Sequence, residues 1–201
     1  MAFDPEARTC LSFDDVLLIP NYSEVASRHD ICLDISDWEG YPIAVGDSTF
    51  ALPILASPMD TVVDRHTATI LANKGISPIL HRYSSFDDQL DDYEFVIQSV
   101  AEGAAPVGVA IGTADDSLEH ANELYDIGCR LFCVDVAHGH HSAAISAVTD
   151  LRRVCTEAFI IAGNVATLEA FDALADAGAN AVRVGIGGGS VCSTRIVTGH
   201  G

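Results

Sequence analysis

Lysine is almost absent from this chain of 201 residues. Lys74 is the only one, and lysine and arginine together number 10 against 29 aspartates and glutamates. The formal net charge of −19 argues against general binding to nucleic acids or anionic membranes, since both need positive protein surface. Adaptation to high salt and a compositional bias of the genome explain the acidity equally well. An anionic ligand would have to be bound by backbone N–H groups and a few arginines.

Long apolar runs are missing as well. No stretch approaches the roughly 20 apolar residues that span a bilayer, and the start of the chain lacks the basic and apolar regions of a signal peptide. The sequence therefore favours a cytoplasmic protein without membrane association. Hydrophobic residues make up 49% and the mean hydropathy is +0.27, which predicts a packed globular protein with one core.

Two common motifs are absent. No GxGxxG follows the first expected strand, which disfavours a Rossmann domain. No CxxC or zinc-type cysteine cluster occurs, so we expect buried free thiols in a reducing compartment. The cysteines are Cys10, Cys32, Cys129, Cys133, Cys155 and Cys192.

After an irregular N-terminal segment, short apolar runs alternate with amphipathic segments at a spacing of roughly 25 residues. Strands are expected at 53–56, 76–80, 107–111, 131–134, 159–162 and 181–184. Helices are expected at 64–73, 86–101, 117–127, 142–155 and 168–177. Six strands with five intervening helices predict a parallel sheet that is covered by helices.

A doubly wound sheet and a (β/α)₈ TIM barrel both fit this alternation, and the polar residues favour the barrel. Polar side chains follow each strand, and in a barrel all strand ends converge on one site. These residues are Ser57, Asp60, His81, Thr113, Asp135, His138 and Asn164, followed by a glycine-rich loop. We expect an α/β fold in which residues 1–201 form the N-terminal three-quarters of one catalytic barrel domain. About six βα units are present, and two are missing at the C-terminal end.

The glycine-rich loop at 184–195 is the most informative segment of the chain. Glycine lets a backbone approach a phosphate closely with its N–H groups. Cys192 in such a loop is placed as a nucleophile, although a flexible turn with an incidental cysteine is the alternative.

Other polar residues also have structural alternatives. Asp135 could cap the next helix, and Asn164 could simply make a turn. Three loop histidines could be solvated or could bind a metal: His138, His140 and His141. Arg183 in a buried strand needs an acidic or phosphate partner, because an unpaired buried charge is costly.

Five motifs together resemble the IMP dehydrogenase/GMP reductase family over nearly the whole chain. They are LSFDDVLLIP at 11–20, PILASPMDTVVD at 53–64, DVAHGH at 135–140, AGNVAT at 162–167 and the loop at 183–199. Two local departures are the triple glycine at 187–189 and His200, where a valine is common.

The resemblance implies the roles of the site residues. Cys192 would attack C2 of the purine of a bound nucleotide, and Thr194 would help to activate water for hydrolysis of the adduct. The substrate would contact Ser57, Met59, Arg183, Gly189 and Ser190, whose loop holds the 5′-phosphate. Asp135, Asn164 and Gly185 would bind NAD. The backbone carbonyls of Gly187, Gly189 and Cys192 would bind a potassium ion.

The details of the motifs favour IMP dehydrogenase, which converts IMP to XMP in guanine nucleotide biosynthesis, with GMP reductase as the alternative. The chain lacks the paired regulatory domain of typical dehydrogenases, since only about 25 residues separate Arg82 from Val107. The resemblance implies a homo-tetramer. We also expect the chain to need a complementing C-terminal fragment for turnover. A third possible function is that of a non-catalytic partner in an assembly.

Overall fold

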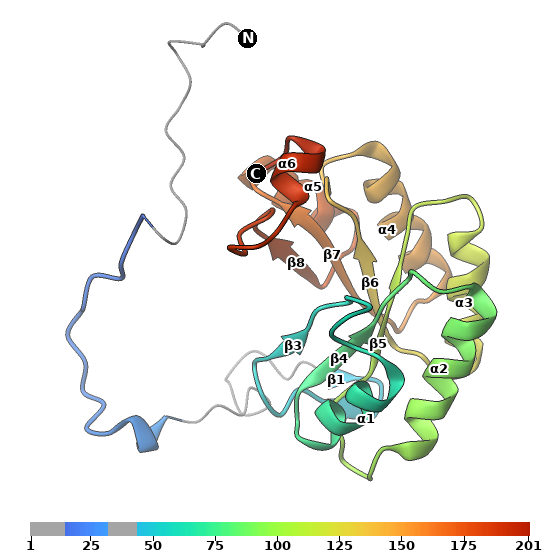
Figure 1. The fold of residues 1–201 in the computed structure, drawn as a ribbon, viewed down its shortest axis with the longest axis horizontal. Coiled ribbons are helices and arrows are strands. Elements are labelled where there is room, and N and C mark those ends of the chain that lie inside the picture. Colours follow the sequence, from blue (N-terminus) through green and yellow to red (C-terminus); the bar gives the residue numbers. More distant parts are fainter. Residues whose placement is uncertain (1–14, 32–43) are drawn as a thin grey trace, which may run out of the picture.

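The computed structural model describes residues 15–31 and 44–201, and its main feature is a six-stranded parallel sheet (Figure 1). The strands are β3 (Leu55–Ala56), β4 (Ser77–Leu80), β5 (Gly108–Ile111), β6 (Leu131–Asp135), β7 (Phe159–Val165) and β8 (Ala181–Val184). The helices between them are α1 (Arg65–Asn73), α2 (Phe86–Ser99), α3 (Ser117–Asp126), α4 (Ser142–Val154) and α5 (Leu168–Asp176). Each strand pairs with the next one along the chain, in the order β3-β4-β5-β6-β7-β8.

This topology confirms the barrel and excludes the doubly wound alternative, whose strand order reverses at a switch point. The sheet curves, and α1 to α5 lie along its outer side, as in part of a (β/α)₈ barrel (Figure 1). β3 and β8 form the two edges of the sheet. The carboxyl ends of all six strands therefore face the same rim.

Side-chain caps explain where most of the helices begin. The Asp64 carboxylate accepts from the Thr67 N–H at 2.7 Å, and Ser85, His141 and Thr167 cap α2, α4 and α5 in the same way. α3 is the exception, since its N-cap Asp116 makes no side-chain cap bond. The expected boundaries of the strands and helices differ from the observed ones by at most three residues.

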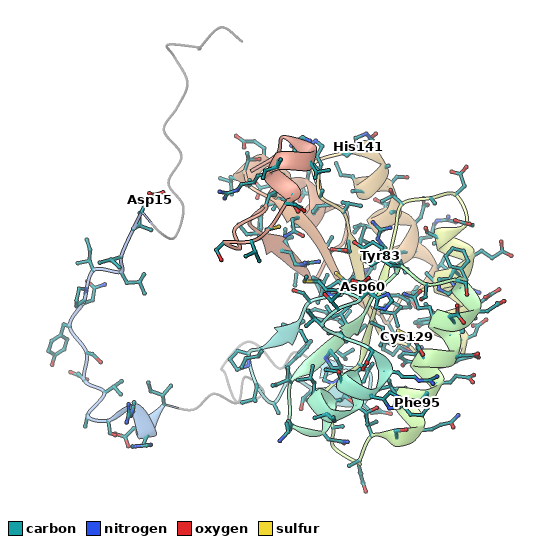
Figure 2. All side chains as sticks on the ribbon, viewed as in Figure 1. Asp15, Asp60, Tyr83, Phe95, Cys129 and His141 are labelled. Carbon is teal, nitrogen blue, oxygen red and sulfur yellow. The ribbon has the colours of Figure 1, made fainter. Side chains whose placement is uncertain are left out.

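The core has two layers, one on each face of the sheet. The outer layer packs the sheet against the helices, and its fully buried members include Phe132, Leu124, Val148, Leu151 and Leu174. Figure 2 shows Cys129 among these side chains, whereas Asp15 lies on an extended segment away from the sheet. Cys129, Cys133 and Cys155 are buried free thiols, as expected, while Cys10 and Cys32 lie outside the described residues.

The inner layer contains a hairpin that the sequence analysis missed. β1 (Ala44–Val45) and β2 (Ser48–Thr49) pair antiparallel, and Val45 and Phe50 pack against inward-facing strand residues. These residues are Ile79, Ala110, Leu131, Cys133 and Ile161. The ring of Phe50 packs edge-on against that of Phe159, at the start of β7, with ring centres 5.7 Å apart. The hairpin thus covers the inner face near the amino ends of the strands, opposite the rim that carries the polar residues.

Two further short elements were not expected: the 3₁₀ helix η1 (Arg28–Asp30) and α6 (Thr194–Thr198). Within the ranges that the structure describes, no helix has the length and apolar character needed to cross a membrane.

Candidate functional site

An ion pair lies at the carboxyl ends of β6 and β8. Arg183 Nη1 donates to Asp135 Oδ1 at 2.5 Å and contacts Cys133 Sγ at 3.6 Å. Burial alone would lower the pKa of Arg183, but Cys133 and Asp135 outweigh this effect and raise it. Arg183 therefore has the acidic partner that its place in a strand required. Asp135 is not a helix cap, because the imidazole of His141 caps α4 instead.

Asn164 joins the loops on both sides of β7. Its side-chain Nδ2 donates to the Gly185 carbonyl at 2.7 Å, beyond the end of β8. Its backbone N–H donates to Val136 and its carbonyl accepts from Gly139, both at 2.7 Å. Asn164 lies within β7, so the simple turn that the sequence left open is excluded. The side chain positions the first glycine of the glycine-rich loop.

The glycine-rich loop is folded against its own C-terminal end. Gly187 has a φ of +62°, and a Cβ there would lie 2.7 Å from Arg195 Cγ, so any other residue would be strained and would displace Arg195. Ile186 is buried, and Arg195 Nε donates to its carbonyl at 3.1 Å. These contacts hold the backbone that presents Cys192.

The Cys192 thiol is exposed and hydrogen-bonded. Its Sγ lies 3.2 Å from Thr194 Oγ1, and its backbone N–H donates to the Gly189 carbonyl at 3.0 Å. Hydrogen bonds from the Thr194 hydroxyl and backbone lower the pKa of Cys192, and the charge of Arg195 adds to this effect. An exposed thiol of lowered pKa has the properties of a nucleophile.

The structure links some of the expected site residues and leaves others apart. Side-chain hydrogen bonds join three pairs: Asp135 with Arg183, Asn164 with Gly185, and Cys192 with Thr194 on the following loop. Ser190 is exposed in that loop. Ser57 and Met59 follow β3, at the other edge of the sheet, and both are exposed. Among the described residues, no hydrogen bond or ion pair joins Ser57 or Met59 to the Cys192 loop.

A cluster of histidine rings next to the loop was not expected from the sequence. His138 stacks on His200 with ring centres 4.6 Å apart, and His141 lies at the edge of His138 at 6.3 Å. Slight desolvation and the neighbouring histidines lower the pKa of His138. Nowhere in residues 15–31 and 44–201 do three His, Cys, Asp or Glu side chains form a group that could hold a metal ion. The three clustered histidines were visible in the sequence, but nothing there indicated the contact with His200.

Comparisons with known proteins agree with this geometry. The family model described as the IMP dehydrogenase/GMP reductase domain matches residues 10–201. The chain belongs to this family. GMP reductases from Streptococcus agalactiae and Streptococcus pneumoniae are 32% and 33% identical to it over 189 residues, which is 94% of the chain. Inosine 5′-monophosphate dehydrogenase from Legionella pneumophila has a similar structure, with a TM-score of 0.78 and 36% identity, and the match covers 96% of this chain.

The chain spans only about half the length of these members of the IMP dehydrogenase/GMP reductase family. The match covers 54% of the curated GMP reductases and 56% of the dehydrogenase in the solved structure. The family consists of oxidoreductases that act on purine nucleoside monophosphates with a nicotinamide cofactor. Its members include both reductases and dehydrogenases, so membership of the family does not decide which of the two reactions is catalysed.

The contact between Thr194 and Cys192 has a measurable consequence in this family member. Thr194→Val removes the hydrogen bond that contributes most to the lowered pKa of Cys192, so the thiol pKa should rise. The rate of alkylation of Cys192 by iodoacetamide follows the thiolate fraction, so the rate profile should move to higher pH, with a several-fold slower reaction at pH 7. Thr194→Ser keeps the hydroxyl and is the matched control. Superimposable profiles for the wild type and Thr194→Val would contradict this assignment.

Proposed function

We propose that this chain carries the covalent catalytic site of an IMP dehydrogenase, which oxidises IMP to XMP with NAD in guanine nucleotide biosynthesis. The observation that supports the proposal most is the exposed Cys192 thiol of lowered pKa, on a glycine-rich loop beyond β8. The Asp135–Arg183 ion pair and the Asn164 side chain, which is bonded to Gly185, lie at the neighbouring strand ends.

The proposed reaction at Cys192 has two steps. The thiolate Sγ forms a bond to C2 of the purine, and the hydrogen on C2 leaves with its electron pair as a hydride. Water then adds to C2, the C–S bond breaks, and the product keeps the new oxygen while the thiol is restored. Thr194, whose Oγ1 lies 3.2 Å from Sγ, would relay a proton from this water. Ser190 and the backbone N–H groups at 187–189 would bind the 5′-phosphate.

The residues at the strand ends fit a nicotinamide cofactor and a monovalent cation. NAD, when bound, accepts the hydride. Asp135 and Asn164 would hold the cofactor through a carboxylate and an amide, with Gly185 bonded to Asn164. The carbonyls of Gly187, Gly189 and Cys192 are the type of ligand that suits potassium. The Gly189 carbonyl accepts the Cys192 N–H and keeps a second lone pair for an ion.

GMP reductase is the second candidate, because the curated relatives at 32–34% identity carry that name. The two reactions are separated by parallel assays of NAD reduction with IMP and NADPH oxidation with GMP. We expect the first to proceed and the second to be at background. Release of ammonia from GMP with oxidation of NADPH would instead establish the reductase.

We further propose that residues 1–201 act as one part of a catalytic barrel. Within the described residues, the outer edges of β3 and β8 have no neighbouring strand, and a closed barrel has no such edges. Two further βα units, from the same or a second polypeptide, would cover both edges, and the whole would assemble as a tetramer. Turnover is expected when the C-terminal part of a related enzyme is added. Full turnover by residues 1–201 alone would contradict this proposal.

A further inference from the structure

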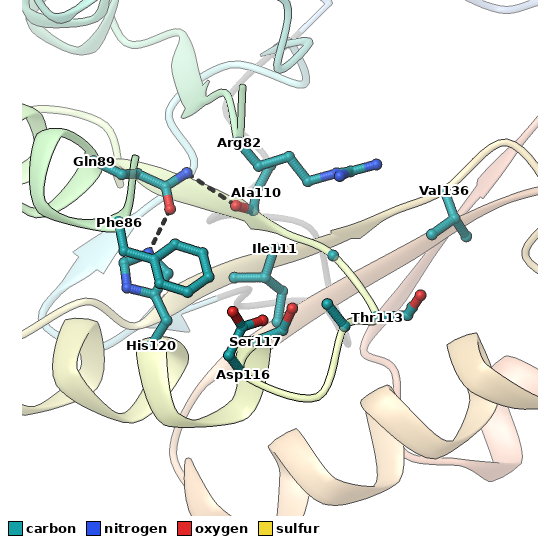
Figure 3. Close-up of a pocket in the computed structure, with 12 residues that line it drawn as sticks. Arg82, Phe86, Gln89, Ala110, Ile111, Thr113, Asp116, Ser117, His120 and Val136 are labelled. Atoms are coloured by element: carbon teal, nitrogen blue, oxygen red, sulfur yellow. Dashed lines mark hydrogen bonds between the residues drawn. The ribbon is translucent and has the colours of Figure 1, made fainter. Parts of the chain in front are cut away.

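A pocket lies between α2 and α3, at the carboxyl end of β5, and none of the residues assigned to the Cys192 site line it (Figure 3). Its volume is about 390 Å³. Apolar and aromatic walls come from Phe86, Ala110, Ile111 and Val136. The polar side chains on its walls are those of Arg82, Gln89, Thr113, Asp116, Ser117 and His120. This mixture of an apolar body and a few convergent polar groups is typical of small-molecule sites.

Arg82 brings a positive charge to this pocket. Its Nε donates to the Asp135 carbonyl at 3.1 Å, which fixes the direction of the guanidinium. Among the described residues, no carboxylate pairs with Arg82, and its two terminal nitrogens have no hydrogen-bond partner. A Cβ added to Gly112 would lie 3.5 Å from Nη1 of Arg82 and 3.6 Å from Oγ of Ser117. The two side chains thus face the same point beside the Gly112 backbone.

Ser117 is a largely buried residue that brings a hydroxyl group to the wall of the pocket. Its relative exposure is 8%, and its hydroxyl has no partner in the part of the chain that the structure describes. It is the first residue of α3, where the positive end of the helix dipole favours an anion. The N-cap Asp116 makes no cap bond, so its side chain does not occupy this helix end.

The inner wall contains a buried polar atom without a hydrogen-bond partner among the described residues, on His120. Both amide hydrogens of Gln89 are used, because its Nε2 donates to the carbonyls of His81 and Ala110. Gln89 Oε1 must therefore accept from His120 Nε2, at 2.6 Å, and the opposite nitrogen, Nδ1, has no hydrogen. This Nδ1 is buried and has no partner among the described residues. Burial lowers the pKa of His120, so the ring is neutral at pH 7 despite the nearby Glu123, Asp116 and Asp87.

From the convergence of Arg82 and Ser117 beside Gly112 we propose that the pocket between α2 and α3 binds a small molecule through an oxyanion, a phosphate or a carboxylate. Arg82 and Ser117 bind the anion beside Gly112, and the exposed ring of Phe86 offers an apolar contact to the rest of the ligand. The Asp116 carboxylate also lines the pocket and opposes a second negative charge. The site is therefore suited to a compact ligand with a single anionic group.

The test uses protein labelled with ¹⁵N in its histidines, titrated in separate arms with inorganic phosphate and with acetate. The ring nitrogens of His120 report on this pocket, and those of His138 and His200 report on the loop of Cys192. We expect saturable shifts at His120 in at least one arm. Binding of phosphate at the Cys192 loop alone would shift only His138 and His200, which would support the proposed function and overturn this inference.

Three variants sharpen the assignment. Arg82→Gln should weaken the His120-detected affinity by about tenfold or more, and Ser117→Ala by a few-fold. Asp116→Asn should strengthen it, since it removes an opposing charge. Arg153→Gln, an exposed arginine on α4 paired with Asp150, is the matched control and should change nothing. No saturable shift at His120, or equal affinities for the wild type, Arg82→Gln and Asp116→Asn, would overturn the proposal.

Discussion

Cys192→Ser should abolish covalent labelling of the protein by 6-chloropurine riboside monophosphate. In the wild type, the thiolate adds to C6 of this analogue, the carbon that bears chlorine, instead of to C2 as in IMP. Chloride leaves, so that a stable thioether remains. A serine hydroxyl stays protonated at neutral pH and is a far weaker nucleophile, so the labelling rate should fall by at least about 10³-fold. Intact-protein mass spectrometry followed by peptide mapping measures both the extent and the position of the adduct.

Internal controls come from the other thiols and from the adjacent serine. Cys133 and Cys155 are fully buried, and burial raises the pKa of each thiol to about 11, so their peptides should stay unlabelled in the native protein. Ser193→Ala changes an exposed neighbour with no side-chain cap bond and should label like the wild type. IMP should protect Cys192 from the reagent. Equal labelling of the wild type and Cys192→Ser would refute Cys192 as the nucleophile, whereas labelling without protection would contradict nucleotide binding at this loop.

The sequence predicts the alternation of strands and helices well, for a local reason. Apolar runs such as Leu131 to Val134 and caps such as Asp64 and Thr167 act over a few residues, so their pattern is readable without tertiary contacts. The barrel also follows from local information, because every strand is followed by polar residues. The exposure of Cys192 was predictable in the same way, from the glycines around it.

Contacts between distant segments could not be predicted in the same way. Asp135 and Arg183 are 48 residues apart, and their ion pair depends on the register of β6, β7 and β8. The strands of the hairpin at 44–49 have two residues each, too few to show alternation, and its anchor Phe50 is recognisable only from the inner face that it covers. The proposed roles of all the site residues stay predictions, and Ser57 and Met59 lie beyond the opposite edge strand, β3.

Gly163→Ala should destabilise the fold at the point where the site is assembled. A Cβ on Gly163 would lie 2.7 Å from both the Cβ and the carbonyl oxygen of Arg183, closer than non-bonded atoms can approach. The obstacle is partly backbone, so a side-chain rotation cannot relieve it, and β7 and β8 must separate. Overpacking of this kind typically costs about 1–3 kcal/mol, and we expect the upper part of that range because two strands are forced apart.

The measured quantity is the urea concentration at the midpoint of unfolding. Unfolding is monitored by circular dichroism and by a second probe of the strands that does not use tryptophan fluorescence. Gly188→Ala is the matched control, since Gly188 has no neighbouring atom within 4 Å of an added Cβ and an ordinary φ, and its midpoint should stay at the wild-type value. The same separation of strands would pull Arg183 away from Asp135 and loosen the Asn164 contact to Gly185. Gly163→Ala should therefore also weaken protection of Cys192 by IMP, an effect that a purely global loss of stability would not produce well below the unfolding midpoint. An unchanged midpoint would show that β8, as an edge strand, yields to the methyl group without cost.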